Sequence, residues 1–210
     1  MKKLLLLAFV LFSAGSVSAD NTMADLFAGK TKLVFLGLDF TQAKYVGKIG
    51  FTDPAAIQNQ HMVSWNNLIE MEPKKFSLQK AFNLKDDQYL SKVEDMVKFN
   101  KAANVADNIT DSEVTLTEDQ AKKAVGKYSL SEKDGVGVVY IIESLNKTSE
   151  KLTAYVTFID LATKKVLYIE KVEGKAGGFG FRNFWAGAVY KINQEIDSKL
   201  YKKWSKSFKS

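Results

Sequence analysis

The 210-residue chain predicts an α+β fold, in which helices cover a mixed α/β sheet as a single sandwich. Three observations predict it. Residues 33–38 form an unbroken apolar run, residues 136–172 hold three segments rich in β-branched and aromatic residues, and residues 181–204 repeat apolar side chains at helical spacing. Because helical and strand patterns alternate without a linker or repeat, one layered domain over residues 20–210 is expected.

The first half of the chain is expected to hold one strand and two helices. The apolar run over 33–38 is typical of a strand buried on both faces. Asp53 predicts a helix start, because its side chain can cap a helix whose first position is Pro54. That helix is expected to end at Pro73. A second helix is expected over 86–103, where apolar residues follow one stripe.

A short strand and a short helix are expected in the middle of the chain. Residues 113–116 are expected to form the strand. Directly after it, Thr117 and Gln120 have the spacing of a capping box, in which two side chains bond the free N–H groups of the first helical turn. This pattern predicts a helix that ends at about Val125.

The last third of the chain gives the clearest pattern. Segments over 136–145, 152–159 and 166–172 are separated by two polar turns, which predicts a three-stranded antiparallel meander. A glycine-rich link over 174–180 leads into a long amphipathic helix that is expected to pack on the sheet. The buried stripe of this helix is expected to comprise Phe181, Trp185, Ala188, Ile192, Ile196 and Leu200.

Composition excludes several classes of protein. The chain has no cysteine, which excludes disulfide-built secreted domains, thiolate zinc sites and a lipid anchor on cysteine. Its formal net charge is +6, but Arg182 is the only arginine, and nucleic-acid readers depend on arginine. We therefore expect no nucleic-acid partner and no cofactor. The excess of lysine is expected to aid solubility or to attract anionic envelope polymers weakly.

The start of the chain has the pattern of a secretory signal peptide. Lys2 and Lys3 precede an apolar run over 4–12, and the small residues of Val17-Ser18-Ala19 form a cleavage site. The apolar run is shorter than the roughly 20 residues that a membrane-spanning helix needs. Cleavage after Ala19 is therefore expected to leave a periplasmic or secreted protein without an integral membrane segment.

The glycine-rich link is the strongest candidate for a ligand- or partner-binding site. Glycines between a strand and a helix let the backbone approach a ligand closely, and the helix N-terminus attracts anions. The pattern lacks the third glycine of a dinucleotide-binding loop. The alternative is a flexible connection that folds its aromatic residues back onto the sheet. The candidate residues are Gly177, Gly178, Gly180, Arg182 and Asn183.

Other reactive side chains give weaker patterns. His61 is the only histidine, so it cannot build a common zinc site with cysteine, and a structural role is favoured. Asp39 follows the apolar strand, where ligands of α/β sheets often bind, and it could form a hydrolase pair with Glu70. It could equally begin a turn. We assign no catalytic residue and no metal ligand from the sequence.

The stretch from Gly135 to Trp204 carries a family resemblance. Its segment VTFIDLATKKVLY resembles the strand–turn–strand of the curli-secretion and penicillin-binding-protein-activator lipoprotein families, in which a meander precedes a C-terminal helix. The resemblance implies an assembly or interaction module and transfers no catalytic residue. Those families are anchored through a lipid-bearing cysteine, which this chain lacks. The chain as a whole also resembles exported bacterial α/β proteins.

These observations favour one function over two alternatives. The leading expectation is an exported interaction module of the bacterial cell envelope, whose partner is an envelope protein or an anionic envelope polymer. A non-enzymatic role is favoured for this module. The second is a protein that binds a small anionic ligand through the glycine-rich link, with Arg182 as the charged contact. The third is a hydrolase that uses Asp39 and Glu70.

Overall fold

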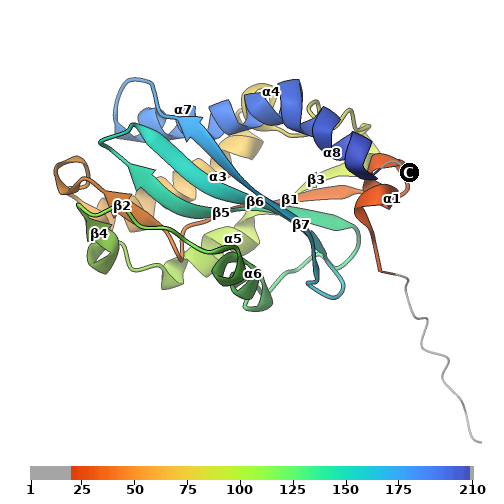
Figure 1. Ribbon diagram of the computed structural model, residues 1–210, viewed down its shortest axis with the longest axis horizontal. Coiled ribbons are helices and arrows are strands. Elements are labelled where there is room, and N and C mark those ends of the chain that lie inside the picture. Colours follow the sequence, from red (N-terminus) through yellow and green to blue (C-terminus); the bar gives the residue numbers. More distant parts are fainter. Residues whose placement is uncertain (1–19, 209–210) are drawn as a thin grey trace, which may run out of the picture.

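The computed structural model describes residues 20–208. A mixed seven-stranded sheet forms the middle layer, and the predicted α+β sandwich is confirmed. Helices α4 (Pro73–Phe76), α7 (Phe181–Glu195) and α8 (Tyr201–Phe208) lie along one face of the sheet, and α5 (Val93–Phe99) and α6 (Glu118–Gly126) lie along the other (Figure 1). The strands are β1 (Leu33–Asp39), β2 (Lys44–Val46), β3 (Tyr89–Ser91), β4 (Ile109–Thr110), β5 (Val136–Asn146), β6 (Lys151–Asp160) and β7 (Val166–Lys175). The α-helices are α1 (Met23–Phe27), α2 (Pro54–Ala56), α3 (Met62–Met71), α4 (Pro73–Phe76), α5 (Val93–Phe99), α6 (Glu118–Gly126), α7 (Phe181–Glu195) and α8 (Tyr201–Phe208).

Strand β5 is the centre of the sheet. On one edge it pairs in parallel with β1 through residues 136–141 and then with β2 through residues 144–146. Strand β3 extends the sheet beyond β1, and β4 extends it beyond β2, both in parallel. On its other edge β5 pairs antiparallel with β6, which pairs with β7. The predicted meander is confirmed, and β7 is left at the edge of the sheet.

Every residue of β1 is buried, as the apolar run predicted. Its outer edge is completed by two asparagine side chains, because β3 pairs only with the first residues of β1. The amide of Asn66 bonds both the N–H and the carbonyl of Leu38, at 2.7 and 3.2 Å. The amide of Asn100 bonds the carbonyl of Leu38 and the N–H of Phe40, both at 2.8 Å. Side chains from α3 and from the turn after α5 therefore replace a neighbouring strand.

The predicted capped helices form largely as expected. Asp53 accepts a hydrogen bond from the N–H of Ala56, and α2 continues through a π-helical turn into α3. The capping box of Thr117 and Gln120 opens α6. The predicted end of the helix before Pro73 is confirmed, since α3 ends at Met71 with Glu72 as its C-cap, and Pro73 then begins the short helix α4. Proline suits that first helical position, since no N–H bond is needed there.

Two predicted elements were wrong. The expected helix over 86–103 begins only at Val93, because residues 89–91 pair with β1 as strand β3. The expected strand over 113–116 is irregular, and the N–H of Leu116 bonds the carboxylate of Glu143 at 2.9 Å. Both errors come from contacts between distant parts of the chain. Strands β2 and β4 and helix α1 were not predicted.

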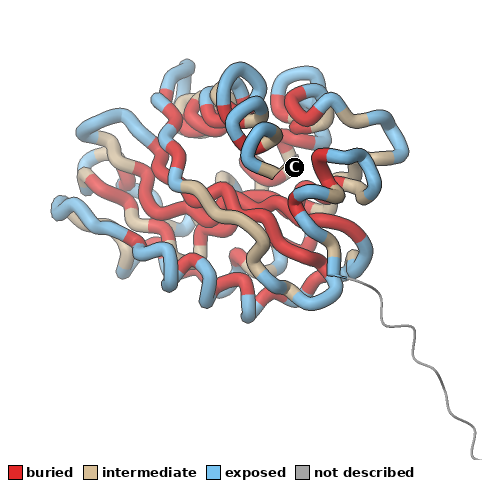
Figure 2. The backbone as a smooth tube through the Cα atoms, turned by 45° about the vertical axis from the view of Figure 1, so that its right-hand side comes forward, coloured by how far each residue is buried: buried red, intermediate tan, exposed pale blue. Residues whose placement is uncertain are grey.

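The core lies on both faces of the sheet (Figure 2). The larger apolar cluster fills the space between the sheet and the helices α3, α4, α7 and α8, and the smaller one lies beneath α5 and α6. The long C-terminal helix is confirmed, and a π-helical turn over Ile196–Leu200 separates α7 from α8. Five residues of its predicted stripe are buried and Phe181 is half-buried; the buried ones are Trp185, Ala188, Ile192, Ile196 and Leu200.

Between residues 20 and 208 no helix has the length and apolar character to cross a membrane. The predicted signal peptide, residues 1–19, lies outside the described residues. The described chain begins beside the β6–β7 turn, where Asp160 accepts hydrogen bonds from the backbone N–H and the side-chain amide of Asn21 at 2.9 and 3.1 Å.

Candidate functional site

The glycine-rich link runs from the end of β7 to the start of α7 and folds back onto that helix. The N–H of Gly177 donates to the carbonyl of Phe184, and the N–H of Phe184 donates to the carbonyl of Gly180, both at 2.9 Å. A Cβ atom on Gly187 would lie 2.0 Å from the carbonyl oxygen of Gly177. The glycine at 187 therefore lets the link lie directly against the helix.

Arg182 is fixed in place at the first turn of α7. Its Nε donates to the hydroxyl of Ser64 on α3, and its Nη1 donates to Oδ1 of Asn183 at 3.0 Å. Its backbone carbonyl accepts a hydrogen bond from Nε1 of Trp65 at 2.9 Å. These bonds join the start of α7 to α3, so that the guanidinium is held at a defined position at the helix N-terminus.

Four of the five predicted site residues line one hollow of about 410 Å³. They are Gly177, Gly178, Arg182 and Asn183, and Lys75 of α4 also lines the hollow. The hollow therefore brings two cationic residues and one acid, Glu72, to the N-terminal end of α7. We call it the Arg182 hollow.

Gly180, the fifth predicted residue, lines a neighbouring hollow of about 280 Å³ together with Gly50, Lys147 and Phe184. This second hollow lies between the link and two other loops. The ammonium of Lys147 sits 3.9 Å from the centre of the Phe184 ring, a cation–π distance. Gly178 lines both hollows. The Arg182 hollow contains two cationic residues, whereas the second hollow contains one cationic residue beside aromatic residues.

Two large exposed apolar side chains lie in the loops that line this second hollow; one of them, Phe179, lines the Arg182 hollow. Ile49 is 91% exposed, and Phe179 is 96% exposed. Their loops meet at the hollow, since Gly50 and Gly178 both line it. Sequence reasoning missed Ile49; the available signal was an apolar residue between Gly47 and Gly50, in a turn that glycine makes possible because Gly47 has a φ of 93°.

His61 packs between aromatic rings. Its ring centre lies 4.9 Å from that of Phe181 and 5.7 Å from that of Trp65. Burial lowers the pKa of His61, and the nearby Arg182 lowers it further, whereas Asp53 acts in the opposite direction. His61 lines a hollow of about 220 Å³ with Asp53 and Phe181. Its contacts agree with the structural role that the sequence favoured.

Asp39 lies in the core. Its carboxylate accepts hydrogen bonds from the Tyr128 hydroxyl at 2.6 Å and from the N–H of Thr41 at 2.8 Å. Burial raises the pKa of Asp39, although these bonds oppose the shift. Glu70 instead accepts a bond from Ser91 at 3.1 Å. Neither acid lines any of the hollows described here, so the structure does not bring them together in a cleft.

A larger hollow of about 690 Å³ lies between α7 and the segment that begins with α4. Three lysines line it, and the only acid among its lining residues is Asp197. Sequence reasoning missed this hollow, because the signal (Lys74, Lys75 and Lys80 close together) reads equally well as a solvated surface. Helix α7 contributes Tyr190, Asn193 and Gln194 to its lining.

No family model matches this chain, and no curated protein is similar to it in sequence. The resemblance to the two lipoprotein families therefore remains a prediction. Among residues 20–208, no group of three or more histidine and carboxylate side chains is arranged to hold a metal ion. The function has to be inferred from the hollows and loops themselves.

Proposed function

We propose that this protein is an exported, non-enzymatic interaction module of the bacterial cell envelope that binds a protein partner through one end of its sheet. We call this end the tip surface and define it as Ile49, Gly50, Lys147, Phe179 and Phe184. The leader pattern of residues 1–19 supports export. The single observation that carries the proposed binding role is the exposure of Ile49 and Phe179, which directly adjoin Gly50 and Gly178, two lining residues of one hollow.

Exposed apolar side chains at the tip surface favour association. Burying a large apolar side chain contributes about 1.5–3 kcal/mol. Single exposed apolar residues are common, but two of them in loops that share an aromatic-lined hollow favour a contact site. The nearby charges are paired, Lys48 with Asp111 at 3.5 Å and Lys147 with Glu150 at 3.9 Å. A charge-balanced rim around an apolar centre matches protein interfaces better than it matches a polyanion.

Site-specific photocrosslinking in the native host tests this proposal. A photoreactive residue at position 179 is expected to yield a discrete adduct with an envelope protein, and Ile49→Ser in the same chain is expected to remove most of it. The matched control carries the same residue at Lys133, which is exposed and precedes the opposite end of β5. The proposal fails if position 179 gives no adduct, or gives the same adducts as position 133.

Export is tested on the same material. Mass spectrometry of the native protein is expected to find Asp20 as the first residue. An intact Met1, or recovery from the cytosolic fraction, would contradict the exported part of the proposal and leave the tip surface to be judged by crosslinking alone.

A second candidate function is the binding of a small anion in the Arg182 hollow. It is favoured by one observation: the fixed guanidinium of Arg182 and the ammonium of Lys75 line the same hollow at the start of α7. A ligand that binds only the folded state raises the melting temperature. Phosphate, acidic sugars and nucleotides are therefore expected to stabilise the wild type but not Arg182→Ala. Lys202→Ala, which removes an exposed cation of α8, is the control.

A further inference from the structure

The Arg182 hollow and the larger lysine-lined hollow lie end to end along α7. Lys75 lines both of them. The residues that α7 and the following turn contribute are spaced by three or four positions, which places them on one face of the helix. From Arg182 to Asp197 this face is about 22 Å long at the rise of an α-helix. These residues are Arg182, Asn183, Ala186, Gly187, Tyr190, Asn193, Gln194 and Asp197. We call the combined feature the α7 groove.

The cations of the α7 groove are available to a ligand. Arg182, Lys74, Lys75 and Lys80 line it, against the two acids Glu72 and Asp197. Within residues 20–208, none of these three lysines takes part in an ion pair.

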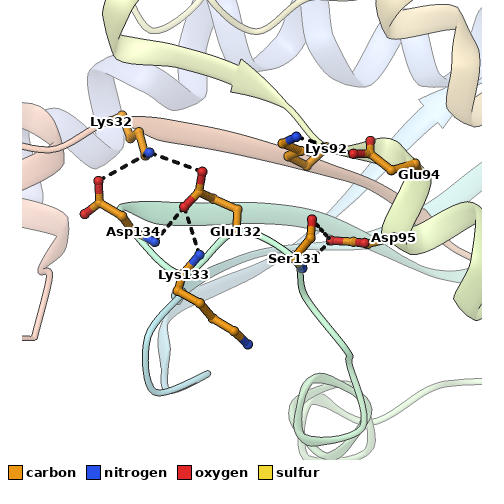
Figure 3. Close-up of polar contacts among 8 residues, drawn as sticks. All are labelled: Lys32, Lys92, Glu94, Asp95, Ser131, Glu132, Lys133 and Asp134. Atoms are coloured by element: carbon orange, nitrogen blue, oxygen red, sulfur yellow. Dashed lines mark hydrogen bonds and ion pairs between the residues drawn. The ribbon is translucent and has the colours of Figure 1, made fainter.

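Ten lysines elsewhere in residues 20–208 lie within ion-pair distance of a carboxylate. Just before β1, Lys32 lies between Glu132 and Asp134, at 3.3 Å from each (Figure 3). Lys171 bonds Glu143 at 2.6 Å, and Lys203 bonds Glu170 at the same distance. Lys74, Lys75 and Lys80 differ from these paired lysines because no carboxylate among the described residues lies within ion-pair distance of them, and they differ from other unpaired lysines because they line one groove. Their charge is therefore directed to solvent or to a bound anion.

The floor of the groove is rigid and polar. The amide of Asn193 is held on both sides, by the hydroxyl of Tyr140 at 2.8 Å and by the carbonyl of Phe76 at 2.7 Å. The ammonium of Lys75 lies 5.3 Å from the centre of the Tyr190 ring, and Nε2 of Gln194 donates to the Tyr190 hydroxyl at 3.0 Å. Fixed amides and an aromatic ring beside cations are groups that can contact the repeating units of an acidic chain.

We propose that the α7 groove binds an extended polyanion, a linear polymer whose repeating units carry carboxylate or phosphate groups. The length of the groove carries this proposal, since Arg182 marks one end and Lys74 and Lys80 line the other hollow. A monomeric anion reaches only one end. This inference deepens the second candidate function by naming its ligand class, but it depends on lysines outside the Arg182 hollow and can be tested apart from it.

Affinity as a function of ligand length tests the proposal. The probes are inorganic polyphosphates and oligogalacturonates of increasing, defined lengths, measured by calorimetry at physiological ionic strength. We expect the affinity to rise at least about tenfold from the shortest to the longest chain and then to level off, and to fall with added salt. A response to only one of the two series identifies the charged group of the natural ligand.

Charge-matched variants locate the binding. Lys74→Gln with Lys80→Gln is expected to weaken binding of the long chains at least about tenfold and to leave pyrophosphate binding unchanged. The control is Lys202→Gln with Lys206→Gln, which removes the same charge from exposed positions of α8 and is expected to change affinity less than about twofold.

The outcomes separate this inference from the second candidate function. Long chains that bind through Lys74 and Lys80, when pyrophosphate does not bind, support the polyanion groove and remove the small-anion site. Binding of pyrophosphate with no gain in affinity for longer chains overturns the polyanion groove and keeps the small-anion site. Equal losses in both double variants show diffuse attraction and overturn the groove.

Discussion

A Cβ atom on Gly37 would lie 2.3 Å from Oδ1 of Asn66. The same oxygen accepts the hydrogen bond from the N–H of Leu38, so the glycine leaves room for the amide that completes the edge of β1. Gly37 also has a φ of 112°, a conformation that side chains disfavour. The contact between Gly37 and Asn66 therefore couples α3 to β1 at a position where β3 no longer pairs with β1.

Gly37→Ala is expected to destabilise the protein by about 2 kcal/mol or more, because the new methyl group meets the Asn66 amide and strains the backbone. Urea denaturation followed by circular dichroism measures this loss. Gly126→Ala is the control: a Cβ atom there meets nothing within 4 Å, and alanine favours the end of α6, so unchanged or slightly higher stability is expected. Equal loss in both variants would contradict the coupling.

Tyr45→Phe is expected to raise the free energy of unfolding by about 1 kcal/mol. The buried hydroxyl of Tyr45 has no hydrogen-bond partner among the described residues, and an unsatisfied buried group is costly. Tyr140→Phe is the matched comparison and is expected to lower stability, since the Tyr140 hydroxyl bonds Asn193 at 2.8 Å. Melting temperatures of the two variants measure the difference. A lower melting temperature for Tyr45→Phe would show that its hydroxyl is bonded.

Asp39→Asn is expected to change the dependence of stability on pH. Burial raises the pKa of Asp39 above its ordinary value, so the folded state holds this proton more tightly than the unfolded chain does. The contribution of Asp39 is therefore fully present below its ordinary pKa of 3.8 and is lost as the pH rises through the folded-state pKa.

Asparagine carries no charge at any pH, whereas all other carboxylates are common to both proteins. The stability of Asp39→Asn relative to the wild type is therefore expected to rise as the pH increases above about 4 and to level off above the folded-state pKa. Urea denaturation at a series of pH values measures it. A relative stability that is constant or that falls over this range would contradict the burial of a raised-pKa carboxyl.

Gly187→Ala is expected to displace the glycine-rich link, because its Cβ atom would lie 2.0 Å from the Gly177 carbonyl oxygen. Limited proteolysis with trypsin, which can cut after Lys175, is expected to become faster in this variant. Gly177→Ala is the control, since a Cβ atom at that position meets nothing within 4 Å. Unchanged cleavage in Gly187→Ala would show that the link does not depend on this contact.

Features of the fold that depend on neighbouring residues could be predicted from the sequence. The capping box of Thr117 and Gln120 and the meander of residues 136–172 join residues close in the chain, and both are confirmed. Tyr89–Ser91 could not be recognised as a strand, because its apolar residues also fit a helix and its partner is the distant strand β1. Leu116 was misread because its N–H bonds Glu143, which is far along the chain.

In the candidate site, too, features set by neighbouring residues could be predicted, whereas contacts between distant segments could not. The position of the glycine-rich link between a strand and a helix was readable from the sequence, and four of its predicted residues line one hollow. The sequence could not predict the hydrogen bond from Arg182 to Ser64, nor that Lys75 and Tyr190 line the same hollow. Each of these contacts joins α7 to a segment more than a hundred residues earlier. The exposure of Ile49 likewise depends on which loops lie beside it.

The edge position of β7 has a consequence for the behaviour of the protein at high concentration. Nothing in residues 20–208 pairs with the outer side of this ten-residue strand, which makes it a template for the strand of another molecule. Exposed Lys171, Glu173 and Lys175 place charges along it. Replacing these three with threonine would remove the electrostatic barrier to intermolecular sheet growth, and the fold would then depend on dilution to avoid fibrils.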